Sequence, residues 1–334
     1  MRISLSTLIR YLIFLIIGLL LLYLAFKGQD LNKMISDLKG ADFVWVFISI
    51  ITSFLAHIIR AYRWNLMIGS LGHGTPPLLN TLNAVILGYL ANLAFPRMGE
   101  LARCSVINKS DNIPVIKLLG TVIAERMVDL LILGLVFAMA ILLEFKFLSG
   151  FLYKYILIKL SGKTGDIALL IFALLLLIMI IGFFFILMKK KKQGIFNRIL
   201  KFFSGMKTGI LSVKNLDNKT AFVISSMFIW LLYGLSSYLC FFALSATSSL
   251  GPGAALSTLV FGSLAMIAPV QGGIGAFHWM VSEGLTIYGI SKIDGLSYAL
   301  LAHTTQTLIT LFIGSISLIL FLKQSTRKRS DEQT

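Results

Sequence analysis

The sequence LGYLANLAFPRMG at residues 87–99 returns later in the chain as FGSLAMIAPVQG at residues 261–272. Both copies run Gly-x-Leu-Ala-x-x-Ala into a Pro that is followed three residues later by Gly, so that Gly88 matches Gly262 and Ala94 matches Ala268. Pro and Gly break helices, and each copy lies in strongly apolar sequence. The pair therefore predicts a membrane protein built from an internal repeat, with a broken helix in each half, as in many transporters.

The alternative is that Gly, Ala and Pro are simply common in membrane helices, where small residues let backbones approach closely. Five identities at matched positions favour a repeat, although one residue must be skipped before the second Pro and the remaining sequence of the halves diverges. We predict a single membrane domain over 1–334, with a first inverted repeat at 1–150, a second at 160–322 and a basic tail at 323–334.

Composition indicates the solvent in which this chain folds. Hydrophobic residues make up 57% of the 334 residues and charged residues 13%, and the mean hydropathy is +0.89. These values are typical of an integral membrane protein. A net charge of +16 would suggest nucleic acid in a soluble protein, but here basic loops that border spans and contact anionic lipid heads explain it better. We expect anionic membrane lipids as partners, and no nucleic acid.

A helix needs roughly 20 mostly apolar residues to cross a hydrocarbon core of about 30 Å. The fold class that we predict is an all-α polytopic membrane protein with about six full transmembrane helices and two re-entrant helical hairpins. The expected spans are 8–26, 43–60, 118–143, 167–188, 221–244 and 297–322. The shorter apolar segments 79–96 and 253–270 each end at a repeated motif and are the expected first arms of the hairpins.

Loop charges predict the orientation, because Lys and Arg accumulate on the cytoplasmic side. The basic loop 189–219 and the tail 323–329 are expected there, whereas 220–291 contains no Lys or Arg. The second hairpin, which returns through 274–290, would then enter from outside, and basic flanks on both sides of 79–96 place the entry of the first hairpin inside. This arrangement predicts a protein of the cytoplasmic membrane with both termini cytoplasmic.

The N-terminal apolar run resembles a secretory signal, but Lys27 follows it instead of a small-residue cleavage site, so an uncleaved anchor is expected. Cys104 and Cys240 are isolated and predicted on or near opposite sides, which suggests neither a disulfide nor a metal pair. The sequence offers no motif for a metal or another cofactor, and none is expected.

Two charged clusters fall where the bilayer is expected. Glu125, Arg126 and Asp129 lie at or inside the start of a long apolar segment, where an unpaired charge costs about 2.5–3.5 kcal/mol. They are either a structural ion pair or a polar wall of a lipid-head or ion pathway. At the turn of the first hairpin lie Arg97, Glu100 and Arg103. Arginine suits a phosphate through its paired donors, but Glu100 could instead neutralise Arg97 or Arg103.

Arg60 and Arg63 lie near the cytoplasmic end of the second predicted span, where His57, Arg60 and Trp64 follow one helix face. A ligand contact by Arg60 or Arg63 competes with snorkelling of arginine and anchoring of tryptophan at the interface.

In the second half, Gln271 and His278 accompany the glycine-rich turn, and His303 lies one turn from Gln306 on the last span. We count Gln271, His278 and His303 as candidate substrate contacts, although a satisfied buried histidine is the usual explanation for a residue such as His303.

Four ordered motifs give the chain a family resemblance: RAYRW at 60–64, NLAFPRMGELAR at 92–103, ERMVD at 125–129 and APVQGGIGAFHW at 268–279. They resemble the flippase-like membrane domain of lysylphosphatidylglycerol synthases, over nearly the whole chain. The resemblance implies a polytopic domain with re-entrant helices that moves lipids or lipid-linked groups between leaflets. Where the family pattern is often acidic after the second turn this chain has His278, so substrate preference could differ.

Full synthases of that family carry a soluble aminoacyl-transferase domain after the membrane part, whereas this sequence ends at Thr334 with a short basic tail. We therefore expect a lipid flippase or transporter for a phospholipid, an aminoacyl-lipid or a lipid-linked sugar, not an enzyme. No phosphate-binding loop for ATP occurs, so movement would be passive, ion-coupled or driven by a partner. The alternatives are an intramembrane enzyme acting on a lipid phosphate and a non-transporting partner of a lipid-modifying enzyme.

Overall fold

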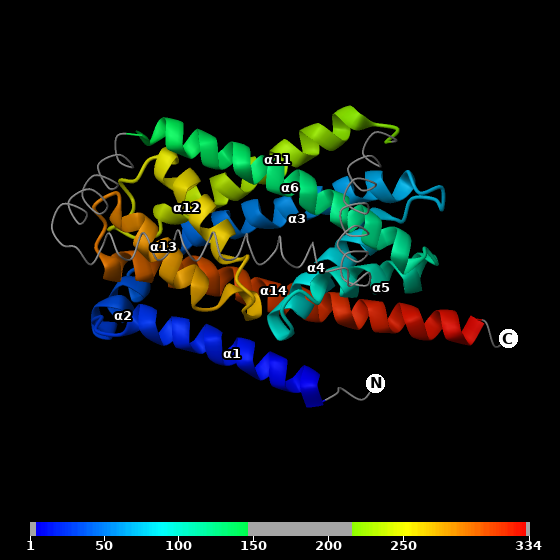
Figure 1. The fold of residues 1–334 in the computed structure, drawn as a ribbon, viewed down its shortest axis with the longest axis horizontal. Coiled ribbons are helices and arrows are strands. Elements are labelled where there is room, and N and C mark those ends of the chain that lie inside the picture. Colours follow the sequence, from blue (N-terminus) through cyan, green and yellow to red (C-terminus); the bar gives the residue numbers. More distant parts are fainter. Residues whose placement is uncertain (1–4, 146–215, 332–334) are drawn as a thin grey trace, which may run out of the picture.

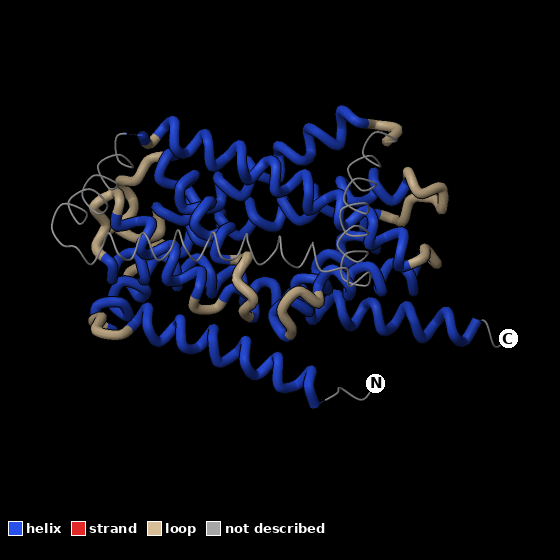
Figure 2. Tube along the Cα trace, in the orientation of Figure 1, coloured by secondary structure: helices blue, strands red, loops and turns tan. Residues whose placement is uncertain are grey.

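A computed structural model describes residues 5–145 and 216–331 of the chain, and every regular element in those two ranges is a helix (Figure 2). The predicted span 167–188 lies outside the described residues. The all-α prediction is thus confirmed for the part of the chain that the structure describes. The apolar helices support an integral membrane protein.

Four of the described helices are long and apolar enough to cross a membrane. They are α3 (Phe43–Gly69), α6 (Val115–Leu143), α11 (Lys219–Phe241) and α14 (Lys292–Asp331). A fifth candidate is the pair α1 (Leu5–Phe26) and α2 (Leu31–Lys39). The two helices are long and apolar enough for a span only when they are taken together, and the chain bends by 93° between them. The predicted total of six full spans is not confirmed.

Several element boundaries differ from the sequence prediction. Helix α3 continues for two more turns beyond residue 60, because the charged residues that suggested an end find buried partners. Helix α2 was not predicted; Asp30 caps it by accepting from the backbone N–H groups of Asn32 and Lys33. Helix α14 begins at Lys292, five residues before the predicted span.

Both copies of the repeated motif form a helix, a break and a second helix. In the first half α4 (Leu78–Ala94) is followed by α5 (Gly99–Asp111). In the second half α12 (Pro252–Ala265) is followed by the short 3₁₀ helix η3 (Gln271–Gly273) and by α13 (Ala276–Thr286). The second break begins earlier than predicted, since α12 ends at Ala265 and not at residue 270. We call α4–α5 the first hairpin and α12–α13 the second hairpin.

The two hairpins lie toward opposite ends of the helix bundle, and the turns that join their arms meet near its middle (Figure 1). Two contacts hold the turns together. Arg97 donates from Nη2 to the carbonyl of Ile267 at 3.2 Å, and Gly272 lies so close to Leu93 that an added Cβ would be 2.7 Å from its Cδ2. The repeated sequences therefore become neighbours in space.

Glycine lets the arms of each hairpin approach. A Cβ added to Gly88 would lie 2.9 Å from the carbonyl oxygen of Gly99 across the first hairpin. A Cβ added to Gly262, its counterpart, would lie 2.8 Å from the ring of Phe277 across the second hairpin. Gly88 and Gly262, which match in the repeat, thus each allow the two arms of a hairpin to pack closely.

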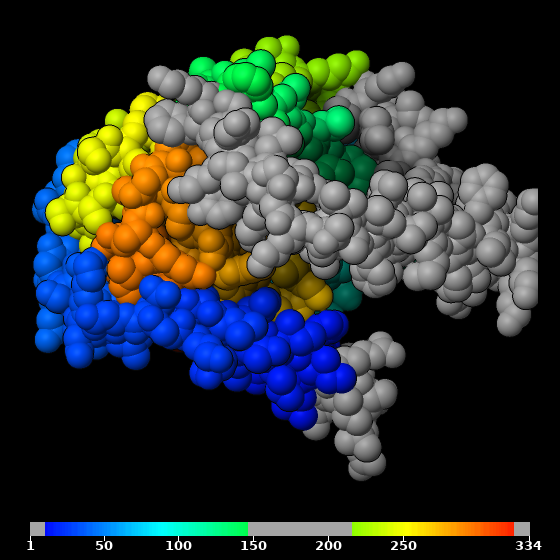
Figure 3. Space-filling view, turned by 60° about the vertical axis from the view of Figure 1, so that its left-hand side comes forward, coloured from blue at the N-terminus to red at the C-terminus, as the bar shows by residue number. Residues whose placement is uncertain are grey.

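Helix α1 lies along the outside of the second hairpin (Figure 3). An added Cβ on Gly18 would lie 3.3 Å from the carbonyl oxygen of Ile274. The carbonyl of Tyr11 accepts a 3.0 Å hydrogen bond from Nε2 of Gln271, and the Tyr11 ring lies 4.6 Å from that of Phe95 in the first hairpin. One helix therefore covers the breaks of both hairpins.

Candidate functional site

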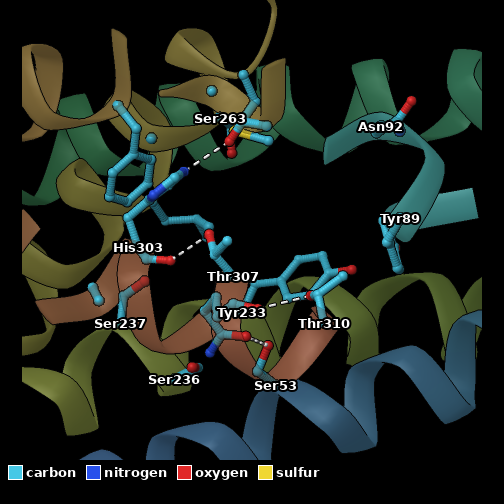
Figure 4. A pocket seen from close by; sticks show the side chains of 18 of the residues that line it. Ser53, Tyr89, Asn92, Tyr233, Ser236, Ser237, Ser263, His303, Thr307 and Thr310 are labelled. Atoms are coloured by element: carbon cyan, nitrogen blue, oxygen red, sulfur yellow. Dashed lines mark hydrogen bonds between the residues drawn. The ribbon is translucent and has the colours of Figure 1, made fainter. Parts of the chain in front are cut away.

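A cavity of about 480 Å³ lies where the two hairpin turns face α3, α11 and α14. Polar side chains from these helices line it, as Figure 4 shows for Ser53, Tyr233, His303 and Thr307. Asn92 lines it from α4 (Leu78–Ala94). A polar cavity inside an apolar helix bundle is a default site hypothesis, because polar groups at membrane depth need partners.

One side of the cavity is rich in hydroxyl groups, and we call this set the hydroxyl wall. Its members are Ser53, Tyr233, Ser237, Ser263, Thr307 and Thr310. Ser53 donates to Oε1 of Gln306 at 3.0 Å, while Thr307 and Thr310 donate to carbonyls one turn back on α14, at 2.8 and 2.7 Å. Each hydroxyl oxygen keeps acceptor capacity after donating, so the wall can still receive hydrogen bonds from a ligand.

Charged side chains reach the cavity from the first hairpin and α6. They are Arg97, Glu100 and Arg126. Arg97 is exposed and has φ 64°, a left-handed conformation that is uncommon for any residue other than glycine. Arg126 lies 3.4 Å from Oε1 of Glu100. Within the described residues, Arg97 forms no ion pair with a carboxylate, in contrast to Glu100 and Arg126.

A second set of charged residues is buried, and we call it the buried arginine network. It consists of Arg60, Arg63, Arg103, Glu125 and Asp129. Arg60 lies 3.3 Å from Glu125 and 3.2 Å from Asp129. Arg63 lies 3.1 Å from Glu125 and 2.8 Å from Asp129, and Arg103 lies 3.0 Å from the other oxygen of Glu125. The network joins α3, α5 and α6, and its three arginines against two carboxylates leave one positive charge.

Burial decides between the interpretations of the end of α3. Arg60 is 5% exposed, while Arg63 and Trp64 are fully buried. Snorkelling and interfacial anchoring were therefore wrong for these residues, because both need contact with the membrane surface. Instead the guanidinium of Arg103 lies 4.6 Å over the Trp64 ring, and Trp64 donates from Nε1 to Thr121 at 2.8 Å. Buried charge is tolerated here because it is paired.

The predicted partners within the charged clusters also change. Glu100 contacts Arg126 and not Arg97 or Arg103, because Arg103 turns toward Glu125. Arg126 also approaches Asp129, at 3.8 Å. Glu125 and Asp129 share a buried face of α6, and neither lines the cavity. The structure thus separates the predicted residues into a cavity group and the buried arginine network.

The candidates of the second half take different positions. His303 lines the cavity, and its Nε2 lies 2.7 Å from the carbonyl oxygen of Gly272. His278 is buried with its ring 4.8 Å from that of His303, and its Nδ1 accepts from the backbone N–H of Gly275 at 3.4 Å. Gln271 is directed to α1 through its bond to Tyr11. Of these three, only His303 is placed to contact a ligand in this cavity.

Sequence reasoning missed the hydroxyl wall. The signal that could have found it is a polar residue every three or four positions along otherwise apolar helices. On α3 it runs through Ser49, Ser53 and His57, on α11 through Tyr233 and Ser236–Ser237, and on α14 through His303, Thr307 and Thr310. Such spacing puts each set on one helix face.

Comparison with protein families gives one match: the family described as the lysylphosphatidylglycerol synthase TM region matches residues 9–314. The chain belongs to this family. Membership agrees with the resemblance carried by the four motifs and supports a lipid-related role for this membrane domain. A comparison with curated proteins returns no match, and neither does one with solved structures.

Proposed function

We propose that this member of the family is a lipid flippase that moves a phosphate-bearing lipid between leaflets. The observation that carries the proposal is the polar cavity at the meeting point of two helix breaks, inside a bundle whose outer surface is strongly apolar. Helix breaks at a buried site are how many transporters present backbone and side-chain groups to a polar substrate.

The size of the cavity suits a head group and not a whole lipid. Its 480 Å³ falls within the roughly 300–1,000 Å³ of small-molecule sites. Acyl chains would then remain outside, against exposed apolar side chains such as Leu131 and Leu135 on α6. This division lets the polar part cross inside the protein while the chains stay in the hydrocarbon.

Arginine supplies the contact for the phosphate. Arg97 and Arg126 both line the cavity, and the planar guanidinium fork matches phosphate oxygens. A small pocket of about 10 Å³, the size of one water molecule, has Glu100, Arg103 and Arg126 among its lining residues. Within the described residues, Nε and Nη2 of the buried Arg103 have no hydrogen-bond partner. Donors at this depth favour an anionic oxygen.

Loop charges support re-entrant hairpins that enter from opposite faces. Lys117 lies 2.7 Å from His73, which places the α3–α4 loop beside the start of α6 at a basic end of the bundle. At the opposite end Lys33 pairs with Asp37 and Asp294. By the positive-inside rule the basic end, where the first hairpin lies, is the cytoplasmic one, with the protein in the cytoplasmic membrane.

Labelling tests this orientation. Lys117→Cys and Ser248→Cys replace exposed residues of the two ends, and both native cysteines are buried. A membrane-impermeant maleimide applied to intact cells should label the variant at Ser248, and the variant at Lys117 should react only after permeabilisation. Labelling of both variants from one side would overturn the inverted placement.

Leaflet exchange tests the function. Purified protein reconstituted into vesicles should expose fluorescent phosphatidylglycerol to dithionite beyond the half that empty vesicles expose. Arg97→Gln should slow the exchange, whereas Lys117→Gln, a basic residue outside the cavity, should leave it unchanged. Equal exchange in empty and protein-containing vesicles, for every lipid tried, would sink the proposal.

A further inference from the structure

We infer that the cavity selects a lipid phosphate whose head group is an uncharged polyol, such as glycerol or a sugar, and rejects head groups that carry an ammonium. This inference rests on the proposed lipid transport and specifies its substrate class. It follows from the charges of the cavity, the chemistry of the hydroxyl wall and the closure of the buried arginine network.

Charge argues against a cationic head group. Among the described residues that line the cavity, Glu100 is the one carboxylate, and Arg126 already lies 3.4 Å from it. Arg97 adds an exposed positive charge at the hairpin turn. An ammonium group entering here would meet no unpaired carboxylate and would be repelled by Arg97.

The two carboxylates of the buried arginine network do not add negative charge to the cavity. Glu125 and Asp129 are each held by two or more arginines at distances from 2.8 to 3.3 Å, and neither lines the cavity. A cation could reach them only if the buried arginine network opened, which would leave buried charges without partners. The nearest anionic groups are therefore already neutralised by the protein itself.

The hydroxyl wall argues for a polyol. Thr307 and Thr310 donate their protons to their own helix, so their oxygens offer only acceptor lone pairs to the cavity. His303 also faces this space, with Nε2 engaged by Gly272. A ligand hydroxyl can donate to these acceptor oxygens, as an ammonium could, but it brings no positive charge into the cavity that Arg97 lines. Glycerol and sugar head groups present several hydroxyls at once.

Competition binding in phosphatidylcholine nanodiscs tests the inference with four probes. Two carry a phosphate and a polyol: dihexanoyl phosphatidylglycerol and a farnesyl-phosphate glucose. Dihexanoyl phosphatidylmethanol keeps the phosphate charge without hydroxyls, and short-chain lysyl-phosphatidylglycerol adds a cationic group. At least one polyol probe should bind about tenfold more tightly than both of the others, an effect of one or two hydrogen bonds. The tighter of the two polyol probes distinguishes a glycerophospholipid from a polyprenyl-linked sugar.

Variants assign the preference to the two sides of the cavity. Ser237→Ala combined with Thr307→Val should bring the affinity ratio of phosphatidylglycerol to phosphatidylmethanol close to one. Thr305→Val, on the same helix but outside the cavity lining, should leave that ratio unchanged. Arg97→Gln should weaken the binding of phosphatidylglycerol and of phosphatidylmethanol by the same factor. Because each ratio is measured within one preparation, partial loss of folded protein does not alter it.

The outcomes separate this inference from the proposed function. Equal or tighter binding of lysyl-phosphatidylglycerol, or equal binding of phosphatidylmethanol and the better polyol probe, overturns the selectivity even if vesicles show leaflet exchange. Selective binding without any exchange in vesicles contradicts the flippase proposal and leaves the head-group inference standing.

Discussion

The two hairpins share a sequence pattern and a shape, yet they differ in charge. The turn of the first hairpin holds Arg97 and is followed by Glu100 and Arg103, whereas the turn of the second is built from Gly272, Gly273 and Gly275. The first turn adopts its left-handed conformation at an arginine, and the second adopts it at glycines. The two hairpins thus share a helix break with a left-handed residue, but the turn of the first is charged and the turn of the second is neutral.

This difference suggests a division of labour along one pathway. Under the proposed function, the first hairpin would supply Arg97 to contact a phosphate. Its second arm, α5, is joined to α6 and through α6 to α3 by the buried arginine network. The second hairpin supplies backbone freedom and packs against α1. If the halves arose by duplication, their common feature is the break itself, and the charges mark where they diverged in use.

Removing the central carboxylate of the first half should have the largest effect on stability. In Glu125→Gln the buried side chains of Arg60, Arg63 and Arg103 lose the carboxylate that they share. The free energy of unfolding should fall by about 3–5 kcal/mol. Thermal unfolding of purified protein in detergent would measure this.

The matched control is Glu100→Gln, because Glu100 is 31% exposed in its side chain and its pair with Arg126 is only partly buried. Its effect should be no more than about 1 kcal/mol. Equal destabilisation by the two changes would contradict the distinction between the cavity group and the buried arginine network.

Matched glycines should respond unequally. In Gly88→Ala the new methyl meets the backbone carbonyl of Gly99, which cannot move without shifting α5, so about 1–3 kcal/mol should be lost. In Gly262→Ala the methyl meets the edge of the Phe277 ring, which can turn aside, and the loss should be smaller. Unfolding curves of both variants would test the order.

Gly134→Ala on α6 serves as the control for this pair, since no neighbouring group among the described residues lies within 4 Å of the added Cβ. The change should stabilise the helix by about 0.5–1 kcal/mol. A loss as large as that of Gly88→Ala would show that alanine at any membrane-helix glycine is harmful, and the comparison of hairpins would fail.

The smallest effect on stability is expected at the turn. Arg97→Gly removes the left-handed strain of about 1–2 kcal/mol together with the bond to Ile267, so the net change in unfolding free energy should be near zero or stabilising. Leaflet exchange should nevertheless fall as far as it does in Arg97→Gln. A clear loss of stability in Arg97→Gly would mean that the side chain mainly holds the turn.

Much of the backbone could be predicted from sequence. The repeated Pro and Gly residues gave both helix breaks, because the chemistry that ends a helix is local. The apolar run that follows Glu125 and Asp129 placed both residues on a long helix, which the structure shows as α6. Helix α2 was missed because it is short and polar, although the Asp30 cap was a usable signal.

Side-chain partners could be predicted less well. Periodicity places Arg60 and Arg63 on a helix face, but it does not tell whether that face meets lipid heads or another helix; the structure shows α6 there. The hydroxyl wall was missed because a serine or threonine in an apolar helix can donate to its own backbone, as Thr307 and Thr310 do, so a single one gives no sign of a site. Only the assembly of α3, α11, α12 and α14 brings them to one cavity.

Tyr11 is bound to both hairpin turns at once, through its ring against Phe95 and its carbonyl to Gln271. Any change in the separation of the turns must therefore break or reorient one of these two contacts. Helix α1 therefore links the two turns. It also shields the backbone polar groups of the second turn, which are not all paired within a helix, from the hydrocarbon. A fluorophore introduced at position 11 would therefore report a movement of either hairpin turn.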